Sequence, residues 1–239
     1  MSSFDRTGFD EYAGHYEGAL QRGLSVSGEN QDYFARRRIE WLAGCLAKSG
    51  DRPKRILDFG CGTGSSTRFF LELVPGASIT GIDISELSLE VARQANPTQY
   101  AEFIPLERYT PNGDMDLAFC NGVFHHILPA KRDEAVRYIC RSLTVGGLFA
   151  FWENNPWNPG TRYVMSRIPF DRDAIPLSAR EGRTLVQRRG LDVLSTDFLF
   201  IFPRILRYMR GLEPALSHLP FGAQYQILCR KRLAQQKQK

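Results

Sequence analysis

The strongest constraint on the fold of this chain is a glycine-rich turn that directly follows a short apolar segment. Residues 56–59 predict a buried strand, and Gly60, Gly62 and Gly64 occupy alternate positions behind it. Glycines allow the backbone to pass close to a ligand, because no side chain fills the space between them. We expect a helix from about residue 65, whose first serine and threonine hydroxyls can cap it. A strand, a glycine turn and a helix N-terminus in this order present free amide groups to a negatively charged ligand.

A second strand brings an acidic residue to the same region. Residues 79–84 predict a short strand, and Asp83 follows the turn by about 20 residues, a spacing at which a carboxylate can hold ribose hydroxyls. The dinucleotide fingerprint requires its third glycine at the position of Ser65, so this turn is of another kind. Residues 57–64 resemble the first motif of the class I S-adenosylmethionine (SAM) dependent methyltransferases, and residues 81–85 resemble their second-strand acid. The alternative is an ordinary tight turn in another doubly wound fold.

The resemblance implies SAM as the cofactor and S-adenosylhomocysteine as its product. The glycines would pass under the methionyl part, Asp83 would take the ribose hydroxyls, and Ile84 would pack on the adenine. Asn121 would offer its backbone to the methionyl end, and Asp58 would order the turn and the cofactor amine through water. The family commonly has an acid near the end of the third strand for the adenine amino group. Here either Glu107 replaces that acid, or backbone and apolar contacts hold the adenine. The expected cofactor-binding residues are Asp58, Gly60, Cys61, Gly62, Gly64, Asp83, Ile84 and Asn121.

Strand and helix patterns alternate along the chain, which is the pattern of a doubly wound α/β sheet. Together with the resemblance, this order predicts a mostly parallel, seven-stranded Rossmann-like sheet with an N-terminal helical lid. Helices are expected at 32–48, 85–94, 131–143 and 178–190. Strands are expected at 56–59, 79–84, 100–106, 116–121, 148–152, 191–202 and 225–230.

We expect one methyltransferase domain over residues 1–239. Its parts would be a lid segment (1–31), a SAM-binding core (32–152), a substrate loop (153–177), a closing helix and strand pair with a helical insertion (178–230), and a tail (231–239). The short helix predicted in the lid segment either covers the cofactor or packs on the outside of the sheet.

Composition limits the classes of partner. The chain has 31 Lys and Arg against 26 Asp and Glu, a net charge of +5, which suits an anionic substrate but does not by itself indicate nucleic acid. The five cysteines are scattered without a Cys-x-x-Cys pair, so neither a zinc site nor a disulfide framework is predicted. No apolar run approaches the ~20 residues of a membrane span, and no signal peptide is visible, so we expect a cytoplasmic protein.

The adjacent histidines His125 and His126 follow the fourth predicted strand directly. Ligands of open parallel sheets bind outside the carboxyl ends of the strands, so a side chain here can reach a transferring methyl group. A histidine at this place can act as a general base near neutral pH. The alternative is that one of the two only packs or holds the loop. We predict no metal site, because the two histidines are adjacent rather than spaced as ligands.

Polar residues after the fifth strand are candidates for acceptor contacts, because loops at this place carry specificity in such folds. The segment 155–157 partly resembles the Asn-Pro-Pro-aromatic signature of methyltransferases that act on exocyclic amino groups. That signature belongs after the fourth strand, so we argue against a DNA amino-methyltransferase. The predicted substrate-binding residues are Tyr16, Glu153, Asn155, Asn158 and Arg162.

An amphipathic, arginine-bearing insertion at about 203–220 separates the last two predicted strands. Either it packs on the sheet edge, or it makes a peripheral contact with a membrane surface or lipid substrate. We expect no stable membrane insertion, and the sequence does not indicate an oligomeric state.

The predicted function is methyl transfer from SAM to a small-molecule or glycan-type acceptor, at oxygen, with a histidine as general base. In methyl transfer the cofactor supplies the electrophile, and the protein aligns the nucleophile. Two alternatives stay open: an RNA or protein methyltransferase, and a SAM-binding module without transfer activity. The modest charge and the lack of a basic stripe with interleaved aromatics argue against the first.

Overall fold

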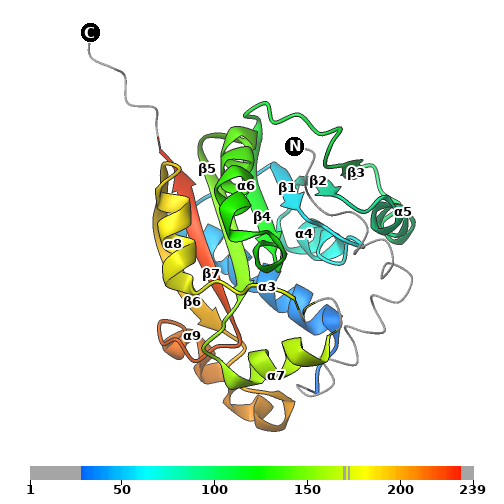
Figure 1. Cartoon of the computed structure of the whole chain (residues 1–239). Helices are drawn as coiled ribbons and strands as arrows, with labels where there is room; N and C mark the ends of the chain where they lie inside the picture. Colours follow the sequence, from blue (N-terminus) through cyan, green and yellow to red (C-terminus); the bar gives the residue numbers. More distant parts are fainter. Residues whose placement is uncertain (1–27, 169–170, 172, 233–239) are drawn as a thin grey trace.

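The computed structural model describes residues 28–168, 171 and 173–232 and contains one seven-stranded sheet in the order β3-β2-β1-β4-β5-β7-β6 (Figure 1). Strands β1 to β5 are parallel, whereas β7 is antiparallel to both of its neighbours. The predicted fold class is therefore confirmed. The strands are β1 (Arg55–Phe59), β2 (Ser78–Asp83), β3 (Ala101–Pro105), β4 (Met115–Asn121), β5 (Leu143–Asn154), β6 (Leu191–Leu199) and β7 (Gln224–Lys231).

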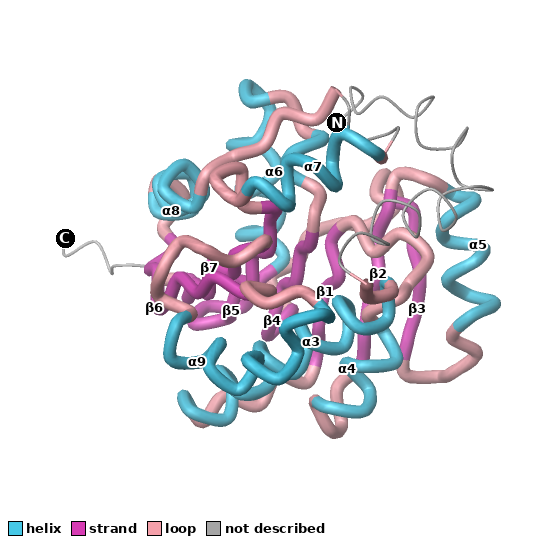
Figure 2. The backbone as a smooth tube through the Cα atoms, turned by 90° about the horizontal axis from the view of Figure 1, so that it is seen from below, coloured by secondary structure: helices cyan, strands magenta, loops and turns pink. Residues whose placement is uncertain are grey.

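Helices cover both faces of the sheet, as Figure 2 shows in a view from below. Adjacent residues of β1 point to opposite faces, so Ile56 joins the core under α3 and α4, while Leu57 joins the core under α6 and α8. Both side chains are fully buried. The described helices are α3 (Gln31–Ser49), α4 (Thr67–Leu73), α5 (Glu86–Ala95), α6 (Pro129–Ser142), α7 (Pro159–Arg167), α8 (Ala179–Gln187) and α9 (Glu213–Leu216), with 3-10 segments η2 (Phe124–His126) and η4 (Arg204–Leu212).

Local signals in the sequence explain several helix starts. Ser85 caps α5 by accepting a hydrogen bond from the backbone of Ser88, and Ser178 forms a capping box with Glu181 at α8. The prediction that hydroxyls cap the helix after the glycine turn is wrong. Ser66 has helical backbone angles there, and its side chain makes no capping hydrogen bond to α4.

Two further predictions concern the N-terminal lid segment and the substrate loop. Residues 1–27, which include most of the predicted lid and Tyr16, lie outside the described residues. The predicted substrate loop contains a helix, α7, that the sequence analysis did not predict. Asn158 caps it by accepting a hydrogen bond from the backbone N–H of Thr161, and Pro159 takes its first position, where a missing N–H costs nothing.

No helix in the described part of the chain is long and apolar enough to cross a bilayer.

Candidate active site

A cavity of about 450 Å³ opens at the carboxyl ends of β1 and β4. Its lining includes the end of β1 with the glycine turn, the end of β4 with η2, residues of α3 and α7, Asp171, and the segment from the end of β6 into η4. This volume is in the range of sites that hold a small ligand and a cofactor-sized group. Lining residues from these regions include Asp58, Gly60, Cys61, Gly62, Asn121, His125, His126, Thr161, Val164, Asp171, Phe200, Pro203 and Arg210.

The three glycines of the turn have different structural roles, although all have positive φ angles. A Cβ on Gly60 would lie 2.4 Å from Val123 Cγ2, and one on Gly64 would lie 3.0 Å from Ala92 Cβ, so these two permit close packing within the protein. A Cβ on Gly62 would meet nothing within 4 Å, and Gly62 lines the cavity. Gly62 therefore keeps space open for a ligand.

Asp83, at the end of β2, fixes the glycine turn through hydrogen bonds. Asp83 accepts a hydrogen bond from the backbone N–H of Gly62 at 2.8 Å through Oδ2 and from that of Ser85 at 3.0 Å through Oδ1. Gly64, Asp83 and Ile84 are not among the cavity-lining residues, so Asp83 acts on the cavity through the turn that it shapes.

Two polar groups in the cavity wall suit a charged, polar ligand. Asp58 is only 3% exposed, and burial together with the nearby charge of Asp83 raises the pKa of its carboxyl to about 7. The buried side-chain oxygen of Asn121 has no hydrogen-bond partner within the described part of the chain. A ligand carrying a cationic amine and further hydrogen-bond donors would satisfy both groups. Asp58, Asn121 and the open space at Gly62 therefore fit the SAM site that the sequence predicts.

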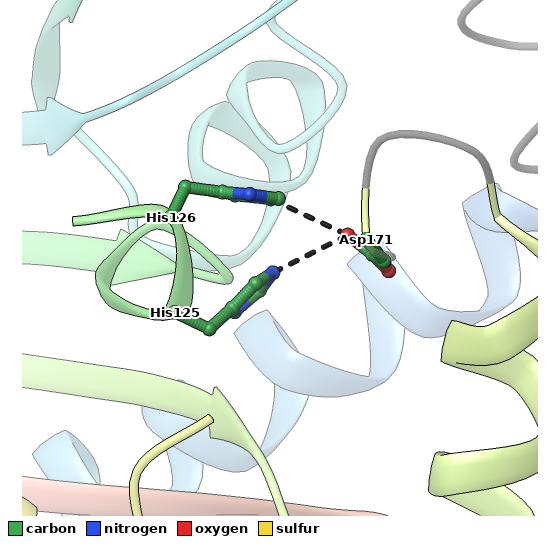
Figure 3. A group of neighbouring side chains, drawn as sticks. All are labelled: His125, His126 and Asp171. Carbon is green, nitrogen blue, oxygen red and sulfur yellow. Dashed lines mark ion pairs between the residues drawn. The ribbon is translucent and has the colours of Figure 1, made fainter. Parts of the chain in front are cut away.

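The two histidines meet an acidic residue from a distant segment, Asp171 (Figure 3). The Nε2 atoms of His125 and His126 lie 3.5 Å and 3.3 Å from Asp171 Oδ1, and the two imidazole rings are 4.1 Å apart. On its other side, the Nδ1 atom of His125 lies 2.7 Å from Glu153 Oε2. Glu153 is 1% exposed and also accepts a 2.7 Å hydrogen bond from the backbone N–H of Phe124. The cluster thus joins the ends of β4 and β5 to the segment after α7.

The surroundings give the two histidines different protonation. Burial lowers the pKa of His125, but the Glu153 and Asp171 carboxylates outweigh burial and raise it to about 10, so His125 is an imidazolium at neutral pH. Burial and the positive charge of His125 lower the pKa of His126, against the opposing effect of Asp171. Burial favours protonated Asp171, yet both imidazoles lower the pKa of its carboxyl. His126 is therefore the neutral histidine of the pair and can accept a proton.

One donor atom from each of His125, His126 and Asp171 lies within 4.8 Å of the others, and these are donor types that divalent transition ions take. In the structure, the Asp171 carboxylate balances the charge of the His125 imidazolium. The cluster could therefore carry out acid–base chemistry, and the expectation that the chain holds no metal stays a prediction.

The predicted substrate-binding residues differ in their hydrogen-bond partners and in whether they line the cavity. The Asn155 amide donates to the carbonyls of Pro220 and Gly222, and Asn158 both caps α7 and donates to the Phe221 carbonyl at 2.7 Å. Of the four described candidates only Asn158 lines the cavity. The full set of described candidates is Glu153, Asn155, Asn158 and Arg162.

Several cavity residues were missed by the sequence analysis. Asp171 lies in a segment without recognisable periodicity, 46 positions beyond His125, and no local signal marks it. Arg38 and Arg210 also line the cavity, the first from α3 and the second from η4, and neither was predicted as a site residue. Arg38 donates to the Gln224 side chain at 2.8 Å, and Arg210 pairs with Glu29 at 2.9 Å.

The chain is similar to known methyltransferases over most of its length. Residues 57–149 match a family model described as a methyltransferase domain. A trans-aconitate 2-methyltransferase from Methylobacterium nodulans is 34% identical over 224 residues, which cover 82% of this chain and 83% of that protein. A malonyl-[acyl-carrier protein] O-methyltransferase from Halalkalibacterium halodurans is 31% identical over 172 residues, which cover 69% of this chain and 59% of that protein.

Coverage differs among the relatives, and three of them are matched over only 54% to 64% of their own length. Among solved structures, a TehB-like SAM-dependent methyltransferase from Corynebacterium glutamicum superposes with a TM-score of 0.61 at 18% identity, covering 93% of this chain and 99% of that one. This likeness concerns the fold alone. It agrees with the mixed seven-stranded sheet and its flanking helices.

Proposed function

The chain belongs to the class I SAM-dependent methyltransferases, and we propose that it methylates an oxygen atom of a small, anionic acceptor molecule with His126 as general base. SAM supplies the electrophilic methyl group. The observation that carries the proposal is the unequal histidine pair on the wall of the cavity that Gly62 keeps open.

Different residues would bind the cofactor, remove the proton and bind the acceptor. Asp58, Gly62 and Asn121 would bind the methionyl part of SAM, and Asp83 would hold the turn that contains Gly62. His125, fixed between Glu153 and Asp171, stays charged and keeps the neighbouring His126 neutral. His126 would remove the proton of an acceptor hydroxyl as the oxygen attacks. Arg38 would attract a negative group elsewhere on the acceptor.

The relatives support a small-molecule acceptor, since their names specify trans-aconitate and malonyl-[acyl-carrier protein]. They also raise a second candidate, transfer to a carboxylate oxygen. A carboxylate is already ionised at neutral pH and needs no base, whereas a glycan-type or other hydroxyl acceptor does. Dependence on His126 therefore separates the two acceptor types. A single domain and a cytoplasmic location complete the proposal.

The test is transfer of labelled methyl from SAM into a cell extract fractionated into small metabolites, lipid and glycan, RNA, and protein. We expect label among small molecules, and we expect His126→Ala to lower turnover by about 10²-fold or more while SAM affinity is unchanged. Asp83→Ala is the inactive control. Label confined to RNA or protein would contradict the acceptor class. Full turnover by His126→Ala would contradict the base and favour the carboxylate acceptor.

A further inference from the structure

Exposed apolar side chains concentrate on two segments beside the cavity. Ile205 is 83% exposed, Tyr208 78%, Trp157 76% and Phe221 61%, and these are among the most exposed large apolar side chains of the described residues. We call this group, with its neighbours on the same two segments, the apolar rim. Its members are Trp157, Tyr163, Ile205, Tyr208, Leu212 and Phe221.

The rim results from how the insertion is anchored. Glu213, 3% exposed, accepts hydrogen bonds from the backbone N–H groups of Ile201 and Phe202 at 2.9 and 3.1 Å. Arg210 pairs with Glu29 at 2.9 Å and lies over the ring of Tyr33. Polar groups thus fasten the segment to the protein, and no residue of η4 is buried. The Ser217 carbonyl also accepts a hydrogen bond from the Phe198 N–H of the edge strand β6, so the insertion is attached to the sheet edge while Ile205 and Tyr208 project into solvent.

Hydrogen bonds join the two segments into one surface. The Asn158 side chain donates to the Phe221 carbonyl at 2.7 Å, and Thr161 Oγ1 donates to the Ala223 carbonyl at 2.7 Å. The start of α7 is therefore held against the loop before β7, and α7 and the insertion lie on the same side of the molecule in Figure 1. Both segments contribute to the cavity wall, through Val164 on one side and Pro203 on the other. The rim therefore lies on two segments that also line the cavity.

The charge on this surface has one sign. Residues 157–168 contain no acid, and the single acid of residues 203–223 is the buried Glu213. The exposed charged side chains of the two ranges are all arginines: Arg162, Arg167, Arg204 and Arg207. A surface that combines projecting aliphatic and aromatic side chains with arginines, and lacks acids, is complementary to an anionic interface with an apolar layer beneath it.

We infer that the apolar rim docks onto an anionic phospholipid bilayer, with Ile205, Tyr208, Trp157 and Phe221 entering the headgroup region and Arg204 and Arg207 meeting lipid phosphates. A bilayer accommodates apolar side chains that project singly between arginines, because lipids rearrange around each one, whereas a protein partner would need a matching pocket for each. Docking in this orientation brings α7 and the insertion, which both line the cavity, to the membrane surface. The inference goes beyond the proposed function and needs neither SAM nor turnover, so the two can fail separately.

The test is sedimentation of the full chain with vesicles of phosphatidylglycerol and phosphatidylcholine, compared with vesicles of phosphatidylcholine alone. We expect binding to the anionic vesicles that weakens as salt is added. The double variant Ile205→Ser/Tyr208→Ser should bind at least tenfold more weakly, because two side chains lose their burial in the bilayer. Arg207→Glu should weaken binding at least fivefold at low salt.

Matched control variants lie away from the rim. Leu194→Ser removes a 47% exposed apolar side chain from β6, and Arg188→Glu reverses an exposed charge at the end of α8. Both should bind like the unaltered chain, and thermal melting should show that every variant is folded. No sedimentation with anionic vesicles, or equal loss in rim and control variants, would overturn the inference. A dimer that the double variant abolishes, without vesicle binding, would assign the rim to self-association instead.

Discussion

Replacing Glu153 by Gln should destabilise the protein in a way that depends on pH. The substitution keeps the size of the side chain and an oxygen for the Phe124 N–H, but it removes the carboxylate 2.7 Å from His125 Nδ1. His125 then loses one of the two charges that keep it protonated. We expect the unfolding free energy to fall most at the pH values at which His125 carries its proton.

The magnitude follows from linkage between protonation and folding. The pKa of His125 is raised from 6.5 to about 10 in the folded protein, and this difference corresponds to about 4 kcal/mol of stability at neutral pH. Because the folded-state value is the higher one, this stabilisation is fully present below pH 6.5 and is lost as the pH rises through 10. Glu153 shares the effect with Asp171, so Glu153→Gln should cost about 2–3 kcal/mol at pH 7 and little of that at about pH 10.

The assay is urea unfolding of the unaltered chain and Glu153→Gln at both pH values, with Glu213→Gln as the control. Glu213 is also buried, but it accepts hydrogen bonds from the backbone N–H groups of Ile201 and Phe202 and does not pair with a histidine ring as Glu153 does. Its substitution should cost a similar amount at both pH values. A Glu153→Gln loss that is equal at pH 7 and pH 10 would refute the assignment of a charged His125.

The glycine turn supports two further predictions. Gly60→Ala should lower stability by about 2–5 kcal/mol, measured by urea unfolding, because a Cβ would clash with Val123 at a positive φ angle, whereas Gly62→Ala should cost only about 1–2 kcal/mol. Gly62→Ala should nevertheless weaken SAM binding at least tenfold by calorimetry, and unchanged affinity would show that the cofactor does not lie over this turn. Asp83→Ala should also weaken SAM binding at least tenfold with unchanged far-UV circular dichroism, and loss of the folded signal would mean that Asp83 is needed for the sheet itself.

The fold was predictable because local signals and the global arrangement agree. The alternation of apolar and helical segments predicted every strand of the sheet, and Ser85 and Ser178 marked helix starts through side chains that cap them. Helix α7 could also have been predicted, since Asn158 followed by Pro159 is a typical start signal. The sequence analysis instead assigned Asn158 to acceptor binding.

The site was predictable only where its residues lie at strand ends. Asn121 and the histidine pair follow β4 directly, so the topology alone brings them to the cavity. Glu153 lies on β5 one strand away, but its contact with His125 depends on the register between β4 and β5. Asp171 arrives through an irregular segment after α7, and no periodicity fixes where such a segment leads.

The place of β7 in the sheet has a consequence for how the chain is made. Strand β6 precedes β7 in the sequence, yet it is hydrogen-bonded to the sheet only through β7, which lies between β6 and β5. During synthesis β6 therefore leaves the ribosome before its pairing partner exists, and β5 presents an open edge for the same period. Nascent chains paused ahead of residue 224 should be the most prone to aggregation and the most dependent on chaperones.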